Sequence, residues 1–175
     1  DIAKGAAGAD FAIEVVTENI GIKKEIFRKL DESTPAHAVL ASNTSYLSIT
    51  EIASSTRRPD KVVGMHFFNP VPIMKLVEVV RTIATSTATF DAALAFARAL
   101  GKEPVIARDT PGFIVNRVLL PMINEGIYTL YEGVGGVTDI DTAMKLGTNQ
   151  PMGPLELADL IGLDTCLAIM EVMHR

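Results

Sequence analysis

The stretch "GMHFFNPVPIMKLVEVVR", Gly64 to Arg81, contains two runs typical of buried β-strands, separated by an Asn-Pro turn. One histidine, His66, stands at the end of the first run, and one glutamate, Glu78, stands inside the second. A buried carboxylate is costly unless it is paired or hydrogen-bonded. If the two strands run side by side after the turn, His66 and Glu78 can meet.

The spacing of this pair leaves two interpretations open. A histidine held by a carboxylate has a fixed tautomer and a stabilised imidazolium, which suits a general base. A structural ion pair between two strands would satisfy the same pattern. We therefore treat His66 and Glu78 as candidate catalytic residues and keep the structural pair as the alternative.

Strand and helix signals alternate on both sides of this stretch. Residues 11–16 and 38–41 are short apolar runs typical of strands, and residues 20–30 carry apolar side chains at helical spacing. Ser48 followed three residues later by Glu51 predicts a capping box that opens a short helix. A further helix and the strand "PVIARD" complete the pattern, which predicts an α/β fold around a largely parallel sheet.

Beyond that strand the strand signals stop. The sequence "DTP" from Asp109 predicts the cap and first turn of a long apolar helix over residues 112–131. Three shorter helices are expected in "TDIDTAMKLG", "GPLELADLIG" and "DTCLAIMEVM". We predict a domain boundary near Asp109, with an α/β domain over residues 1–108 and an all-α domain over residues 109–175.

Composition narrows the possible partners. The chain of 175 residues is 48% hydrophobic and carries a formal net charge of -5, which argues against nucleic acid or an anionic membrane as the main partner. The single cysteine, Cys166, excludes a disulfide framework and a multi-cysteine metal site, and we expect no metal. Because no long uncharged apolar run or signal sequence is present, we expect a cytoplasmic protein.

Polar residues follow the predicted strands, where open α/β sheets bind their ligands. The turn Asn43 to Ser45 offers hydroxyl and amide groups to a ligand, or it forms a Ser/Thr turn that caps the next helix. Asn116 lies near the predicted domain boundary and could bond a substrate oxygen or form an interdomain hydrogen bond. For both sites, the sequence pattern does not decide between the two interpretations.

The motifs "ASNTS", "GMHFFNPVPIMKLVEVV", "DTPGFIVNR", "DIDTAMKLG" and "PMGPLELADLIGLD" follow one another along nearly the whole chain. In this order they resemble the L-3-hydroxyacyl-CoA dehydrogenase family, in particular its short bacterial 3-hydroxybutyryl-CoA dehydrogenases. The resemblance implies the C-terminal part of a Rossmann-type NAD-binding domain over residues 1–108. It also implies part of a helical substrate-binding and dimerisation domain over residues 109–175.

The resemblance further implies an NAD-linked oxidoreductase, with NADP left open, that interconverts a short-chain (3S)-3-hydroxyacyl-CoA and its 3-ketoacyl-CoA in fatty acid or butanoate metabolism. The residue matching His66 removes the hydroxyl proton as hydride leaves for the nicotinamide, and the residue matching Glu78 orients and charge-balances it. Ser45 and Asn116 match residues that contact the reacting end of the substrate. Positions near the nicotinamide and its ribose match Glu18, Lys23, Asn43, Ser45 and Asn69. The full-length protein is expected to be a homodimer.

The family's dinucleotide fingerprint is expected upstream of Asp1, and its last helices beyond Arg175, so we expect this chain to be a fragment. Gly5 and Gly8 precede a strand and do not make that fingerprint. Two other functions stay open. One is a non-catalytic structural relative with the same fold, and the other is a related hydroxy-acid dehydrogenase that does not use coenzyme A.

Overall fold

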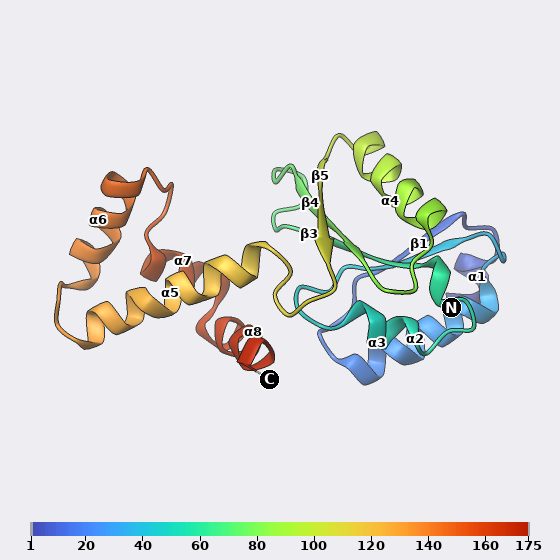
Figure 1. Cartoon of the computed structure of the whole chain (residues 1–175), viewed down its shortest axis with the longest axis horizontal. Helices are drawn as coiled ribbons and strands as arrows, with labels where there is room; N and C mark the ends of the chain where they lie inside the picture. Colours follow the sequence, from blue (N-terminus) through green and yellow to red (C-terminus); the bar gives the residue numbers. More distant parts are fainter. Residues whose placement is uncertain (1, 175) are drawn as a thin grey trace. The chain divides into compact units, whose positions relative to one another are not determined.

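The computed structural model describes residues 2–174. The chain divides into two compact units, of which unit 1 ends at Phe113 and unit 2 begins at Ile114 (Figure 1). Residues 109–113 therefore belong with unit 1.

Unit 1 is built on a five-stranded sheet in the order β1-β2-β3-β4-β5. Strands β1, β2 and β3 are parallel, β4 is antiparallel to β3, and β5 is parallel to β4. The prediction of a largely parallel sheet is confirmed. The antiparallel step follows from the short turn between β3 and β4, which is too short for a crossover. The strands are β1 (Phe11–Glu14), β2 (Val39–Ser42), β3 (Val62–Phe67), β4 (Leu76–Arg81) and β5 (Glu103–Arg108).

Helices cover both faces of this sheet. Figure 1 shows α2 and α3 on one face and α4 on the other. Because successive side chains of a strand point to opposite faces, the sheet contributes to two apolar clusters. Val80 packs in the cluster with Phe27 of α2, whereas Val79 packs in the cluster with Phe90 of α4. The helices of unit 1 are α1 (Ile2–Ala6), α2 (Ile20–Ser33), α3 (Ile49–Ala53) and α4 (Thr87–Ala99), with a 3₁₀ turn at Pro59–Lys61.

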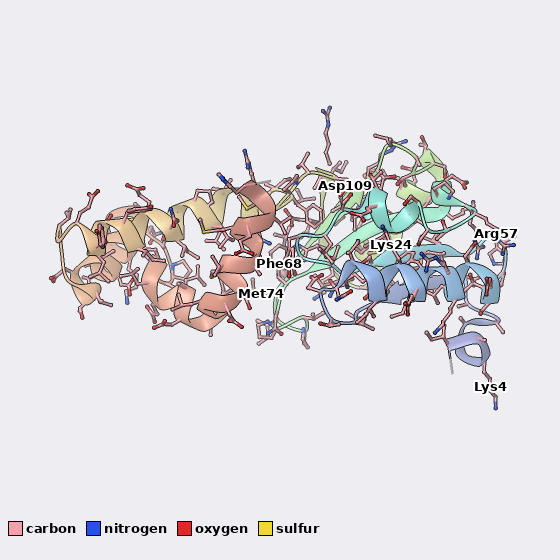
Figure 2. All side chains as sticks on the ribbon, turned by 90° about the horizontal axis from the view of Figure 1, so that it is seen from below. Lys4, Lys24, Arg57, Phe68, Met74 and Asp109 are labelled. Carbon is pink, nitrogen blue, oxygen red and sulfur yellow. The ribbon has the colours of Figure 1, made fainter. Side chains whose placement is uncertain are left out.

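The cap of α3 is only partly local. As predicted, the Ser48 hydroxyl accepts a hydrogen bond from the backbone N–H of Glu51, at 3.2 Å. The Asp109 carboxylate also accepts from the backbone N–H groups of Ile49 (3.0 Å) and Thr50 (2.6 Å). Asp109, labelled in Figure 2, therefore caps α3 from the far end of β5.

The prediction that Asp109 caps the long helix is therefore wrong. Helix α5 begins at Val115 instead. Gly112 and Phe113 just before it have positive φ angles of 79° and 47°, which a right-handed helix does not allow. Asp109 is thus separated from α5 by a turn, and it caps α3 instead.

Unit 2 is all-helical over its described residues, as predicted. Its helices are α5 (Val115–Tyr131), α6 (Val137–Thr148), α7 (Pro154–Ile161) and α8 (Leu163–His174). The buried Asp141 of α6 accepts hydrogen bonds from the backbone N–H groups of Leu155 (2.9 Å) and Glu156 (3.0 Å). It caps α7 much as Asp109 caps α3. No helix among residues 2–174 is long and apolar enough to cross a membrane.

A charged cluster holds the end of α2. The buried Asp31 carboxylate accepts from the Arg57 side chain at 3.1 Å and from Arg58 Nε at 2.8 Å. Burial raises the pKa of Asp31, but the hydrogen bonds from the Arg57 backbone and from both arginine side chains together lower it by more, so that the net shift is downward. The ionised carboxylate therefore stabilises the folded state.

We expect the stabilisation by Asp31 to depend on pH. Because its folded pKa lies below the unfolded value near 3.8, its contribution is fully present above that value and is lost as the pH falls through the folded pKa. Asp31→Asn should lower the free energy of unfolding by about 1–3 kcal/mol at pH 7. Urea unfolding at pH 7 and pH 3 measures the difference, and a loss that is equal at both values would contradict this account.

Gly64 on β3 is required by close packing. A Cβ built there would lie 2.7 Å from Val80 Cβ and 2.9 Å from Ile49 Cγ1. Gly64→Ala should therefore destabilise unit 1 by about 1–3 kcal/mol through overpacking. Gly5→Ala is the matched control, because nothing lies within 4 Å of an added Cβ there. Equal unfolding midpoints in urea for the two variants would rule out the packing argument.

Candidate active site

Strand register places His66 opposite Glu78. In the antiparallel pair β3–β4 these two residues are direct partners, and His66 Nδ1 lies 2.8 Å from Glu78 Oε2. Their side chains are only 7% and 1% exposed, so the interaction is shielded from water. They share a sheet face with Gly64 and Val80, the face covered by α2 and α3.

The protonation pattern of His66 follows from its partner. An ionised carboxylate can only accept hydrogen bonds, so Nδ1 carries the hydrogen and donates it to Glu78. The ring is also packed against Phe68, at 4.4 Å between centroids, and Phe113, at 5.8 Å. An imidazole held in one tautomer and one orientation leaves Nε2 as the nitrogen that can exchange a proton with a ligand.

A stabilised turn joins the two strands of the pair. The backbone N–H groups of Ile73 and Met74 donate to the Pro70 carbonyl, and the Lys102 ammonium donates to the carbonyls of Val71 and Met74. Phe68 and Met74, labelled in Figure 2, lie at the two ends of this turn. Asn69, a predicted cofactor residue, is exposed in it.

A second buried polar cluster lies where β1 and β2 end. Glu14, the last residue of β1, accepts from Lys23 Nζ at 2.8 Å, from the Val16 backbone N–H at 2.6 Å and from Ser42 Oγ at 2.7 Å. Lys23 of α2 is completely buried and also donates to the Val16 carbonyl. The Lys23 ammonium is therefore held in place by β1 and its following loop.

Glu18 links this cluster to the turn after β2. Its carboxylate accepts from Thr44 Oγ1 and from the Ser45 backbone N–H, both at 2.6 Å, and lies 3.7 Å from Lys23 Nζ. Burial raises the pKa of Tyr46, and the negative charge of Glu18 raises it further. Glu18 presents a carboxylate, 26% exposed, beside Ser45.

The turn from Asn43 to Ser45 forms the expected Ser/Thr turn and makes one further contact that the sequence did not predict. Thr44 Oγ1 accepts from the Leu47 backbone N–H at 3.0 Å, as in a Ser/Thr turn. Asn43 Oδ1 accepts from the Phe67 backbone N–H at 2.8 Å, next to His66 in the chain. The side chain of Asn43 therefore ties the carboxyl end of β2 to that of β3.

The structure brings most of the predicted site residues together within unit 1. Glu18, Lys23 and Ser45 form one connected cluster, and Asn43 connects the turn after β2 to the strand that carries His66. Asn116 lies in unit 2, buried in the first turn of α5.

Sequence reasoning missed Glu14, Ser42 and Thr44. A usable signal existed for Glu14, which stands in the apolar run "FAIEVV" as Glu78 stands in "KLVEVV". The same cost of burying a carboxylate that singled out Glu78 applies to Glu14. Ser42 and Thr44 carry no comparable signal.

We also searched the rest of the described chain for metal sites and ligand cavities. Within residues 2–174 no group of three or more His, Cys, Asp or Glu side chains could hold a metal ion. Unit 2 contains an apolar cavity of about 430 Å³ between α5, α6 and α7, lined among others by Met122, Ile140 and Met144. None of the predicted site residues lines it, so the candidate site rests on the sheet of unit 1.

Comparison with known proteins gives the same assignment for both units. Residues 1–110 match the family model "3-hydroxyacyl-CoA dehydrogenase, NAD binding domain", and residues 112–175 match "3-hydroxyacyl-CoA dehydrogenase, C-terminal domain". The chain is 60% identical over 169 residues to a Bacillus subtilis (strain 168) protein named "Probable 3-hydroxybutyryl-CoA dehydrogenase", which covers 97% of this chain. It is 50% identical over 175 residues, 100% of this chain, to the human "Hydroxyacyl-coenzyme A dehydrogenase, mitochondrial".

A solved structure agrees closely with the fold. The crystal structure of (S)-3-hydroxybutyryl-CoA dehydrogenase PaaH1 from Ralstonia eutropha matches with a TM-score of 0.96 at 48% identity, covering 99% of this chain and 61% of that one. The chain spans 59% of the length of the Bacillus relative and 56% of the human one. With both units matched by models of one family, the chain belongs to the 3-hydroxyacyl-CoA dehydrogenase family.

Proposed function

We propose that this protein is an NAD-dependent oxidoreductase that interconverts a short-chain (3S)-3-hydroxyacyl-CoA and the corresponding 3-ketoacyl-CoA. The observation that carries the proposal is the buried hydrogen bond between His66 and Glu78. The names of the relatives support the substrate class, since the Bacillus and Ralstonia proteins are named for 3-hydroxybutyryl-CoA.

His66 is the proton acceptor in this proposal. In the oxidation direction Nε2 takes the proton of the substrate hydroxyl, and in the reduction direction it returns a proton to the carbonyl oxygen. Glu78 holds Nδ1–H and balances the charge of the imidazolium that forms. The aromatic rings of Phe68 and Phe113 keep the imidazole in its orientation.

The polar groups at the carboxyl ends of β1 and β2 fit the nicotinamide ribose end of NAD. Glu18 offers a partly exposed carboxylate to a sugar hydroxyl, and Asn43, Ser45 and Asn69 offer uncharged polar groups. NAD, when bound, supplies the acceptor for the hydride. We also propose that Lys23, which is buried and paired with Glu14, lies near the nicotinamide ribose and acts on the cofactor site through Glu18.

The remaining assignments rest on the family resemblance and on the composition of the chain. We assign Ser45 and Asn116 to the reacting end of the substrate. We assign cofactor binding to residues 1–108, and substrate binding with dimerisation to residues 109–175. We place the protein in the cytoplasm as a homodimer with a role in fatty acid or butanoate metabolism, including β-oxidation.

An activity assay separates this proposal from its two alternatives. Protein expressed from the complete gene should oxidise NADH with acetoacetyl-CoA and be far slower with free acetoacetate, because the coenzyme A portion contributes binding energy to the reaction. Equal rates with both substrates would favour a hydroxy-acid dehydrogenase that does not use coenzyme A. No rate with either would favour a non-catalytic relative.

The His66–Glu78 pair is tested by isosteric substitution. His66→Gln should lower kcat by about a hundredfold or more, because glutamine cannot carry the proton. Glu78→Gln should also lower kcat while keeping the volume of the side chain. A purely structural pair predicts instead that both variants lose several degrees of melting temperature and keep their rate per folded molecule. Retention of more than about a tenth of kcat by His66→Gln would refute the proton-acceptor role.

The two substrate contacts give a separate test. Ser45→Ala and Asn116→Ala should each lower kcat with acetoacetyl-CoA by about a hundredfold, the usual cost of one aligned donor to a reacting oxygen. Ser54→Ala is the matched control, because Ser54 follows α3 as its C-cap and its hydroxyl donates to the Glu51 carbonyl of that helix. Turnover near the wild-type value in both site variants would leave these residues with a bracing role only.

A further inference from the structure

Glu14 is a second fully enclosed carboxylate near the candidate site, besides Glu78, and no catalytic step described above uses it. Its side chain is 0% exposed. Both of its oxygens are engaged, Oε1 by Lys23 Nζ and the Val16 backbone N–H and Oε2 by Ser42 Oγ. Burial of a carboxylate is unfavourable unless partners compensate it, and both oxygens of Glu14 have partners.

The partners of Glu14 lead to Ser45 by two routes. In the first, the Lys23 ammonium lies between two carboxylates, 2.8 Å from Glu14 and 3.7 Å from Glu18, and Glu18 in turn accepts from the Ser45 N–H. In the second, Ser42 is the last residue of β2 and directly precedes the turn that carries Ser45. Both routes begin at one carboxylate.

We propose that Glu14 is a positioning residue of the active site, which holds Lys23 and Ser42 so that Glu18 and Ser45 present their polar groups in a fixed geometry. The functional part of this inference rests on the proposed dehydrogenase activity, because Glu18 and Ser45 are the proposed contacts to cofactor and substrate. The effect of Glu14 on the positions of Glu18 and Ser45 can be tested in the ligand-free protein. Glu14 itself contacts neither ligand in this proposal.

The positioning role proposed for Glu14 requires its negative charge, which a neutral residue at this position would lack. With Glu14 ionised, the Lys23 ammonium is drawn to β1, away from Glu18, and the Glu18 carboxylate stays available to the Ser45 N–H and Thr44 Oγ1. Without that charge the buried ammonium has Glu18 as its nearest carboxylate and pulls it inward. A displacement of about 1 Å at such a site can cost a hundredfold in rate.

The experiment compares Glu14→Gln with Asp31→Asn in protein expressed from the complete gene. Both changes neutralise a buried carboxylate of unit 1 with almost no change in volume, and Asp31 is paired with Arg57 and Arg58 away from the candidate site. Both should lower the melting temperature. Only Glu14→Gln should speed hydrogen exchange of the Ser45 amide in ligand-free protein, by about tenfold or more, because its charge-assisted acceptor moves.

Ligand binding and kinetics provide the second measurement. Glu14→Gln should weaken NADH binding, measured by fluorescence titration, and lower kcat/KM for acetoacetyl-CoA reduction by about tenfold to a hundredfold, with Asp31→Asn within about twofold of wild type. Adding Lys23→Met to Glu14→Gln should cost little more than Glu14→Gln alone, because residues that act through one another are not additive.

The outcomes separate this inference from the proposed function. Equal Ser45 exchange in Glu14→Gln and Asp31→Asn at equal loss of melting temperature would overturn the positioning role, whatever the enzyme does. Absence of NADH binding and turnover in wild-type protein would overturn the proposed function, while the exchange comparison would still decide the geometry. If Glu14→Gln does not fold, Ser42→Ala, which removes one hydrogen bond to the same carboxylate, replaces it and should speed exchange at Ser45 severalfold.

Discussion

The antiparallel pairing of β3 with β4 is the constraint on which the candidate site depends. It aligns His66 with Glu78 and Gly64 with Val80 on one face of the sheet. A shift of one residue would turn Glu78 to the opposite face, among the apolar side chains around α4, where no histidine could meet it. The close contact at Gly64 admits no Cβ, so packing against Val80 and Ile49 holds the same register that the His66–Glu78 hydrogen bond requires. Core packing and site chemistry thus specify one alignment.

Buried and partly buried carboxylates organise the rest of unit 1. Asp109 caps α3 across about sixty residues of sequence, Asp31 holds the loop after α3, and Glu14 joins β1 to α2 and β2. Each is satisfied by several donors, so its desolvation cost is offset and its partners are restricted to one geometry. Strand β2 lies between β1, which carries Glu14, and β3, which carries His66. Asn43 follows β2 and connects its carboxyl end to that of β3. The polar side chains of unit 1 are therefore held in place by hydrogen bonds to one another and to the backbone.

Much of the fold could be predicted from local patterns. The alternation of strands and helices, the Ser48 capping box and the helical character of residues beyond α5 were all visible, because periodicity and capping depend on residues within one or two turns of each other. The juxtaposition of His66 and Glu78 was a conditional prediction that needed only a tight turn between two strands. Asp109 was assigned to the wrong helix, because its position just before residues 112–115 is also typical of an N-cap of the following helix. The positive φ angles of Gly112 and Phe113, which separate it from that helix, are not evident from composition.

Sequence patterns were enough to identify the family, to place an α/β unit before an all-α unit, and to find a carboxylate in each of two apolar strands. Which donors those carboxylates bind became clear only from the three-dimensional structure. Glu78 meets His66, but Glu14, in nearly the same sequence context, meets Lys23 and Ser42. The physical reason is range: secondary structure follows from the energies of neighbouring residues, whereas a buried charge is satisfied by whichever donor the packed sheet and helices bring within about 3 Å.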